Sequence, residues 1–471
     1  MSPSHPLLDQ VRAAAAVRPG AAAVVHDSTA RTYRELLADI DRLAGQLRAE
    51  GVEPGDTVAL PARRDAHLPV SMLALWQAGA TIALIDSTLP PAVIAAREAV
   101  VRPAWRLAGT TPVRLADDPR PRAAGGSHIL FTSGSTGRPA AVEVGASALE
   151  GGLRWYRETF APGASDRVGL LSGLGHDPVL RDILVPLVSG GTLLVPPDGV
   201  AARPSDLAGF LDSAGVTILH TTAAMLELLV AAGRPMPRLR LVVAGGAPLP
   251  AGLVRGLRPL TPAAVANAYG ATETPQIVAC SVVAGNTLPD PELPDETSMP
   301  VGSGVGGAEL LVTGPAGEVV VCSPYLADGY LPGTGRPERF GDDPRGRPGY
   351  RSYRTGDRGE WGPDGLRIAG RIDREISVNG FRIAPEEVES AARRHPAVRQ
   401  ARAGRYAGPA GDLIELRVSV AGAEATSTRS LRAHLRAQLP GHAVPARIRI
   451  VPDPGLDANH KTTLMRSTDD D

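Results

Sequence analysis

The stretch ILFTSGSTGRPAAV, residues 129–142, gives the first firm indication of how this chain folds. Its opening residues are apolar, as in a buried strand, and lead into a loop of small and hydroxyl residues. Glycines let the backbone approach an anion closely, and hydroxyl groups add hydrogen-bond donors. A flexible surface loop is the alternative, but it would not normally follow a buried strand. A Walker A loop is excluded because its consensus lysine is absent. The stretch therefore predicts a phosphate-binding loop formed by Thr132, Ser133, Gly134, Ser135, Thr136 and Gly137.

The composition narrows the class of protein around this loop. At 471 residues the chain exceeds one ordinary domain, and a hydrophobic content of 43% is enough for sizeable cores. A net charge of −1 gives no basic footprint, so neither nucleic acid nor an anionic membrane is predicted as a partner. The two cysteines, Cys280 and Cys322, argue against a disulfide scaffold, and no signal peptide or membrane-spanning run is found. We therefore expect a soluble, cytoplasmic protein.

On both sides of the loop, short strands alternate with amphipathic helices. This alternation is typical of α/β units around largely parallel sheets. Further along, three stretches separated by turns indicate antiparallel strands. The expected helices cover 32–51, 68–80, 206–215 and 223–233, the expected strands of the alternating part cover 57–64, 81–86, 216–220 and 239–246, and the expected antiparallel strands cover 308–314, 317–323 and 365–371.

The pattern changes after about residue 373. A helix, a strand, a second helix and a second strand are expected over 384–398, 413–422, 428–439 and 446–451, which together indicate a compact α+β unit. We place a boundary near Asp373. It divides the chain into a large N-terminal unit, 1–372, and a smaller C-terminal unit, 373–471.

Further motifs follow one another in a characteristic order. They are TYRELLADIDRLAGQL (32–47), WQAGATIALIDSTLP (76–90), NAYGATET (267–274), ADGYL (327–331), YRTGDRG (353–359), GRIDREISVNGFRIAPEEVE (370–389) and NHK (459–461). With the phosphate loop, the whole chain resembles the adenylate-forming superfamily, which includes acyl-CoA synthetases, luciferases and peptide-synthetase adenylation domains. The resemblance implies an α/β fold, in which a large N-terminal domain has mixed and parallel sheets flanked by helices. It also implies a small β-barrel-like subdomain and a small α+β C-terminal domain.

The motif at 267–274 carries groups suited to a nucleotide and its metal. Tyr269 offers a flat ring on which a purine can stack, and Thr272 offers a donor to phosphate. Glu273 supplies a carboxylate for Mg²⁺, which prefers oxygen ligands and substrate phosphates. A turn before a helix, with threonine as the N-cap, is the alternative. The resemblance implies ATP and Mg²⁺ as cofactors, catalytic roles for Thr272 and Glu273, and a nucleotide site that includes Gly245, Gly246, Ala247, Asn267, Ala268 and Gly270.

Two later motifs add groups for the ribose and for domain movement. Asp357 can accept hydrogen bonds from both ribose hydroxyls, although an Asx turn would also explain an aspartate beside glycine. In the GRID motif, Arg371 matches the family's arginine that reaches the nucleotide, and Asp373 matches its hinge. The resemblance implies that the C-terminal domain rotates about this hinge between adenylation and thioester formation.

Lys461 is the only lysine among 49 cationic residues. Coding bias could leave one lysine by chance, but lysine carries a compact point charge whereas arginine is a planar fork. Attack of a carboxylate on the α-phosphate of ATP brings two anions together, and electrostatic stabilisation is then the main catalytic resource. The resemblance assigns Lys461 to bridging these anions. The sequence departs from the family pattern at two places. Ala140 and Ala141 stand where the family usually has Lys-Gly after the phosphate loop, and His460 stands where it usually has glycine before the lysine.

The stretch GLGHDPVLRDILVPL, 173–187, bears on the choice of acid. By resemblance, Asp177 pairs with the α-ammonium of an amino acid, because a desolvated ammonium needs a partner. An N-cap for the following helix is the alternative. Arg181 either pairs with Asp182, which leaves a small pocket, or points inward and favours a polar or acidic side chain. We expect a small or polar amino acid, and the resemblance lines its pocket with Pro178, Arg181, His220, Val242, Ala244, Ala268, Gln276 and Ile277.

These observations predict an amino acid adenylating ligase of the nonribosomal peptide synthetase type. It would form aminoacyl-AMP and pyrophosphate, and then load the phosphopantetheine thiol of a carrier protein. No carrier segment follows Lys461, so we expect the carrier to be separate, and an MbtH-like helper is a further expected partner. One alternative is an acyl- or aryl-CoA ligase acting on a non-amino acid. The other is a catalytically weak nucleotide-binding homologue, suggested by Ala140 and Ala141.

Overall fold

The computed structural model describes residues 5–115, 119–121, 128–132, 139–200, 203–285, 287–378, 380–408, 411–420 and 426–451. Ser133 to Gly137 of the predicted phosphate loop and the predicted catalytic Lys461 therefore lie outside the described residues. Within the described ranges, no helix combines the length and the apolar character needed to cross a bilayer.

The largest sheet has nine strands in the order β15-β14-β13-β12-β11-β9-β10-β1-β2. Its strands from β1 to β13 along this order are parallel, and β2, β14 and β15 are added antiparallel at the edges. The bounds are β1 (Ala22–His26), β2 (Thr29–Thr32), β9 (Arg167–Gly169), β10 (Thr192–Val195), β11 (Ile218–Thr221), β12 (Leu241–Gly245), β13 (Ala264–Ala271), β14 (Thr274–Val283) and β15 (Ser303–Gly304).

A second sheet has seven strands in the order β18-β8-β7-β4-β3-β5-β6. Its central strands β7, β4, β3 and β5 are parallel, and the outer strands are antiparallel. The bounds are β3 (Thr57–Ala62), β4 (Thr81–Asp86), β5 (Trp105–Ala108), β6 (Thr111–Arg114), β7 (His128–Thr132), β8 (Ala140–Val144) and β18 (Gly329–Tyr330).

Helices cover both faces of the large sheet and join the two sheets into one core. In α2 a capping box stabilises the start, because Thr32 and Glu35 each accept from the other's backbone N–H. In α6 every residue from Val179 to Val188 is buried, so this helix lies inside the core. The bounds are α1 (Pro6–Val17), α2 (Tyr33–Ala49), α3 (His67–Gln77), α4 (Pro91–Val101), α5 (Ala146–Phe160), α6 (Pro178–Val188), α7 (Pro204–Ser213), α8 (Ala223–Ala232) and α9 (Ala251–Leu257).

The predicted antiparallel strands form a five-stranded sheet with its own apolar cluster around Tyr353 and Val319. The order is β16-β17-β20-β19, and β21 pairs with β20 off this path. The bounds are β16 (Glu309–Thr313), β17 (Glu318–Ser323), the short helix η2 (Pro337–Arg339), β19 (Phe340–Asp342), β20 (Arg351–Gly362) and β21 (Gly365–Arg371).

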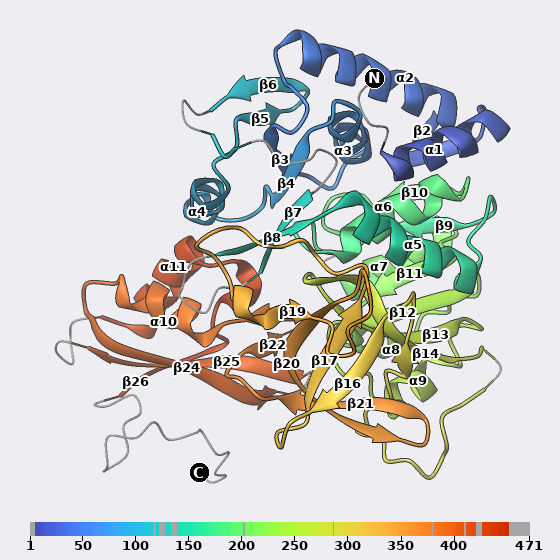
Figure 1. The fold of residues 1–471 in the computed structure, drawn as a ribbon. Coiled ribbons are helices and arrows are strands. Elements are labelled where there is room, and N and C mark those ends of the chain that lie inside the picture. The colour runs from blue at the N-terminus through green and yellow to red at the C-terminus, as the bar shows by residue number, and fades with distance from the viewer. Residues whose placement is uncertain are drawn as a thin grey trace.

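The C-terminal elements form a separate apolar cluster that extends from Ile376 to Ile448. Figure 1 shows these elements, in orange and red, grouped together below α4, and α11 contacts α4. The independent core agrees with a boundary near Asp373, which stays a prediction. The bounds are β22 (Ile376–Val378), β23 (Phe381–Ile383), α10 (Pro385–Arg393), β24 (Val398–Gly408), β25 (Gly411–Val420), α11 (Thr428–Gln438), η3 (Gly441–Ala443) and β26 (Arg447–Ile450).

Strand direction brings the predicted site residues together. Since β11, β12 and β13 are parallel, their carboxyl ends meet at one edge of the large sheet. This edge carries His220, Gly245 and Tyr269. The turn after β13 leads into the antiparallel strand β14, so the alternative of a threonine-capped helix after Tyr269 is wrong.

Candidate functional site

A large cavity, of about 1890 Å³, opens at this edge and extends to the C-terminal elements. Most of the predicted site residues that the structure describes contribute to its walls. They are Thr132, Asp177, Pro178, Arg181, His220, Gly245, Gly246, Ala247, Asn267, Ala268, Tyr269, Gly270, Thr272, Glu273, Gln276, Ile277, Asp357, Arg371 and Asp373.

Two predicted pocket residues are placed elsewhere. Val242 and Ala244 are buried in β12 and belong to an apolar cluster with α8 and α9. Side chains alternate along a strand, so these two share a face while Val243 joins the cluster on the opposite face. The cavity walls do not include Val242 or Ala244.

Asp177 is held in the cavity wall by Gln276. The backbone N–H of Gln276 donates to Oδ2 of Asp177 at 2.8 Å, and its Nε2 donates to Oδ1 at 2.8 Å. Gln276 has a φ of 67°, a backbone conformation that is strained for a residue with a side chain. In this conformation its backbone N–H and its Nε2 both donate to the carboxylate of Asp177. The Asp177 side chain makes no capping hydrogen bond with α6, so the N-cap alternative is wrong. Burial raises the pKa of Asp177 to about 6, although the charge of Arg181 opposes this shift.

Asp182 pairs with His220 and not with Arg181. Its Oδ1 lies 2.7 Å from Nδ1 of His220, and its Oδ2 accepts the backbone N–H groups of Leu171 and Ser172. Nε2 of His220 lies 2.8 Å from the hydroxyl of Tyr156. Burial lowers the pKa of His220 although Asp182 opposes the shift, so the ring is neutral near pH 7. Asp182 therefore binds His220 and two backbone N–H groups, and not Arg181.

Arg181 points into the cavity from α6, one turn after Asp177. The residue is only 6% exposed. Its Nη1 lies 3.4 Å from Oε1 of Gln276, and its Nε has no hydrogen-bond partner among the described residues. None of the ion pairs in the described part of the chain includes it. The pocket therefore contains a buried cation that interacts with the charge of Asp177 but forms no ion pair with a carboxylate of the described residues.

Asp357, the predicted ribose ligand, receives three donors. The hydroxyl of Tyr269 and Nη2 of Arg382 reach Oδ2 at 2.6 and 2.8 Å, and Nη1 of Arg371 reaches Oδ1 at 2.6 Å. All three donors are side chains and not the nearby backbone N–H of an Asx turn, so an Asx turn does not explain the side chain. Arg382 belongs to β23 of the C-terminal elements. Sequence analysis did not single out Arg382, although it stands inside the quoted motif GFRI.

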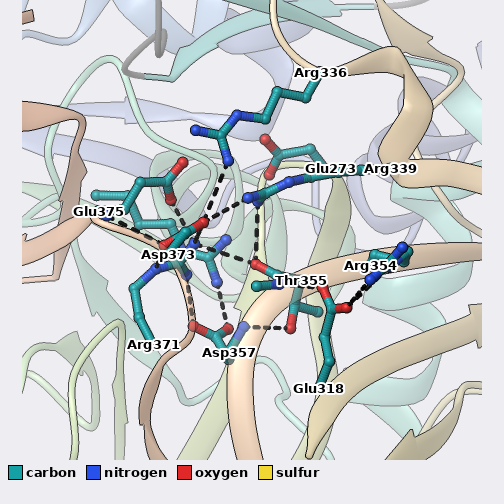
Figure 2. Close-up of polar contacts among 12 residues, drawn as sticks. Glu273, Glu318, Arg336, Arg339, Arg354, Thr355, Asp357, Arg371, Asp373 and Glu375 are labelled. Atoms are coloured by element: carbon teal, nitrogen blue, oxygen red, sulfur yellow. Dashed lines mark hydrogen bonds and ion pairs between the residues drawn. The ribbon is translucent and has the colours of Figure 1, made fainter. Parts of the chain in front are cut away.

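Asp373, the predicted hinge, lies at the centre of an arginine cluster (Figure 2). Its Oδ2 accepts from Arg336, Arg339 and Arg371 at 3.4, 2.5 and 2.8 Å. Burial would raise the pKa of Asp373, but the hydrogen bonds and charges of Arg371 and Arg339 outweigh burial and lower it to about 2. Arg336 and Arg339 were missed because they stand in a stretch, GRPERF, that matches no motif.

Glu273 lies in the turn between β13 and β14. It is 4% exposed, and its Oε1 accepts a hydrogen bond from the hydroxyl of Tyr330 at 2.6 Å. The described residues contain no group of three His, Cys, Asp or Glu side chains that could hold a metal alone. One buried carboxylate beside a nucleotide cavity fits Mg²⁺, which commonly takes one or two carboxylates, substrate phosphates and water.

The β22–β23 hairpin packs against the loop after β12. Ser377 Oγ donates to the backbone oxygen of Gly246 at 3.1 Å. Gly246 has a φ of 80°, and a Cβ atom there would lie 2.8 Å from Cα of Gly380. Only glycine fits this approach. The predicted adenine-binding loop, Gly245 to Ala247, thus contacts the C-terminal hairpin directly.

Comparisons with known proteins agree with this fold and cavity. Residues 11–107 and 98–331 match the family described as AMP-binding enzyme. The chain is 33% identical over 489 residues to CymA, a probable nonribosomal peptide synthetase from Salinispora arenicola (strain CNS-205). That match covers 95% of this chain but 6% of the synthetase, so the chain corresponds to one part of a much longer relative.

Two solved structures have the same fold. Holo-PA1221, a synthetase protein containing adenylation and PCP domains, has a TM-score of 0.81 at 25% identity, over 98% of this chain and 83% of that one. A double mutant of o-succinylbenzoate CoA synthetase (MenE) from Bacillus subtilis has a TM-score of 0.79 at 20% identity, over 96% of this chain and 97% of that one. The second likeness shows the fold alone. From the family match and these similarities, the chain belongs to the AMP-binding enzymes of the adenylate-forming superfamily.

Proposed function

We propose that this chain activates an amino acid with ATP and transfers it to a carrier protein. In the first step a carboxylate oxygen attacks the α-phosphorus of ATP, an O–P bond forms, and pyrophosphate leaves. In the second step the thiolate of a phosphopantetheine group attacks the acyl carbon, a thioester forms, and AMP leaves. Both steps conserve atoms and charge without an oxidant or reductant.

One observation carries the amino acid assignment, namely the Asp177 carboxylate in the wall of the nucleotide cavity. It is 6% exposed, and Gln276 binds each of its oxygens with one donor. A carboxylate oxygen accepts more than one hydrogen bond, so both remain able to accept from an ammonium. Burying an isolated carboxylate is costly, and a bound α-ammonium would offset that cost. A site for a fatty or aryl acid would have no such requirement.

The groups around Asp357 support the position proposed for ATP. Asp357 and Arg371 would bind the ribose, and the ring of Tyr269 and the loop after β12 would contact the adenine. Glu273 would hold Mg²⁺, whose charge helps to neutralise the triphosphate when the ion is bound. Thr272 and the loop from Thr132 to Gly137 would donate to phosphate.

Lys461 would bridge the attacking carboxylate and the α-phosphate. Since Arg382 of β23 now binds Asp357, the C-terminal elements already contact the nucleotide site. We propose that residues 373–471 rotate about Asp373 relative to residues 1–372, which would bring Lys461 to the site for adenylation and withdraw it for thioester formation. An MbtH-like protein is proposed as a helper.

A CoA ligase is the second candidate, because MenE, an o-succinylbenzoate CoA synthetase, has the same fold. The fold therefore does not distinguish a carrier thiol from the thiol of coenzyme A. Both carry phosphopantetheine, and the difference lies in the surface that accepts the rest of the donor molecule.

A pyrophosphate-exchange screen tests the proposal. The full chain is assayed with the common amino acids, and with hydroxy, aryl and fatty acids, with and without an MbtH-like protein. We expect exchange with an amino acid, followed by thioester formation on a phosphopantetheinylated carrier in preference to coenzyme A. Exchange with aryl or fatty acids only, and acyl-CoA as product, would establish the CoA ligase instead. ATP binding without exchange for any acid would indicate a catalytically weak homologue.

A further inference from the structure

Arg181 is an unusual residue to find in a pocket for a neutral side chain. It is 6% exposed and lies in the cavity wall. Its Nε has no hydrogen-bond partner among the described residues. A guanidinium stays charged in proteins, so burial cannot simply neutralise it. A buried cation normally pairs with an anion or forms a full set of hydrogen bonds.

The carboxylates next to Arg181 are committed to other groups. Asp182 uses one oxygen for His220 and the other for two backbone N–H groups. Asp177 receives both donors of Gln276 and, in the proposed function, also the α-ammonium of the substrate. With a neutral amino acid bound, the positive charge of Arg181 would therefore stay unneutralised.

Spacing along α6 fits a substrate that carries both charges. Asp177 stands at the start of α6 and Arg181 four residues later, so the two side chains lie on the same face, about one helical turn of 5.4 Å apart. An amino acid whose α-ammonium meets Asp177 would extend its side chain along this face toward Arg181. Gln276 contacts both residues, and all three belong to the wall of the same cavity.

We propose that the activated acid is an α-amino acid with a side-chain carboxylate, and that Arg181 binds this carboxylate. Planar guanidinium and carboxylate groups form paired, charge-assisted hydrogen bonds, which would satisfy the unpartnered Nε. Arg181 is then the specificity-determining residue for an aspartate-like or glutamate-like substrate. This inference rests on the proposed amino acid activation and deepens it.

The unmodified chain supplies the first test. Pyrophosphate exchange is measured with aspartate, glutamate and 2-aminoadipate, with asparagine and glutamine as uncharged matches, and with neutral amino acids. We expect one acidic amino acid to exceed its amide in kcat/KM by about 10²–10³-fold. Highest activity with a neutral amino acid would overturn the acidic assignment and leave amino acid activation standing. Exchange with non-amino acids alone would refute the proposed function itself.

Arg181→Gln supplies the second test, with Arg42→Gln on the exposed face of α2 as the matched control. We expect Arg181→Gln to lose about 10²–10³-fold in kcat/KM for the acidic substrate and to prefer the amide, while KM for ATP is unchanged. Its thermal midpoint without ligand should not fall, because a buried unpaired cation is removed. Retention of the acidic preference by Arg181→Gln would overturn the proposal, and the substrate screen remains decisive if this variant does not fold.

Discussion

The hydroxyl of Tyr269 donates to Oδ2 of Asp357 at 2.6 Å, so the ring proposed for the purine and the carboxylate proposed for the ribose form one unit. Arg371 and Arg382 engage the same carboxylate. Ribose hydroxyls must therefore join or displace donors that are already present. Because Arg382 comes from the C-terminal hairpin, a nucleotide bound as proposed would be energetically linked to the position of that hairpin.

We expect Asp357→Asn to raise KM for ATP by about 10–100-fold, since a hydrogen bond to a charged group contributes about 1.5–3 kcal/mol. It should also lower the free energy of unfolding by about 1.5–3 kcal/mol, because Arg371 and Arg382 each lose one charged acceptor, while Arg371 keeps Asp373 and Glu375. Tyr269→Phe is the control, because it keeps the aromatic ring and leaves the Asp357 carboxylate in place. Its KM for ATP should change by less than about threefold. Exchange kinetics and urea unfolding measure these effects. Equal KM values for the two variants would contradict the ribose role.

Asp177→Asn should lower kcat/KM for the amino acid by about 10²–10³-fold, because truncating the charge that neutralises a buried ammonium costs several kcal/mol. KM for ATP should change little, since the side chain of Asp177 is hydrogen-bonded to Gln276, which has no proposed role in ATP binding. Asp212→Asn, an exposed residue of α7, is the matched control. Exchange assays that vary each substrate separate the two KM values. A rise in KM for ATP alone would place Asp177 in the wrong subsite.

The activity should depend on the protonation of Asp177. Burial raises its pKa to about 6, with Arg181 opposing, and only the ionised form attracts an ammonium. The kcat/KM for the amino acid should thus be constant above about pH 7 and fall by up to tenfold per unit as the pH drops below 6. Exchange rates from pH 5 to 8 measure this limb. Asp177→Asn should not show this fall of kcat/KM at low pH. The same fall in that variant would assign the titration to another group.

Lys461→Ala should reduce adenylation by about 10²–10³-fold, as expected for one aimed electrostatic group. Lys461→Arg should recover little, because a planar fork does not replace a point charge between two anions. Arg466→Gln is the matched control in the same terminal stretch and should retain adenylation. Single-turnover formation of acyl-AMP is the measurement. If Lys461→Ala were as active as the Arg466→Gln control, the proposed bridge would be wrong.

Local patterns predicted much of the fold but little of the detail within the cavity. Thr32 and Glu35 indicate the start of α2 because a capping box involves only neighbouring residues. Strands β4 and β21 match their expected bounds within one residue because their residue patterns are also local. The link between Asp177 and Gln276, by contrast, joins residues 99 positions apart and requires a left-handed backbone at Gln276. No local pattern encodes such a contact.

The same reasoning explains the other differences. Arg336 and Arg339 surround Asp373 only because η2 lies beside β20, and their own stretch gives no signal. Val242 was assigned to the pocket by alignment, but it is buried in the apolar cluster with α8 and α9 and is not part of the cavity walls. A motif thus indicates which chemistry is present, while the face of a strand decides which residues take part.

The double hydrogen bond from Gln276 also limits how the pocket could be redesigned. A change at Gln276 intended to admit a new side chain would remove one donor from Asp177 and disturb the backbone angle that directs the other. Libraries for altered substrate choice should therefore keep Gln276 and Gly152, whose missing side chain leaves room for it, and vary Arg181 and Ile277. In this scaffold the proposed amino-group anchor, Asp177, would stay unchanged while Arg181 of α6 and Ile277 of β14 are varied.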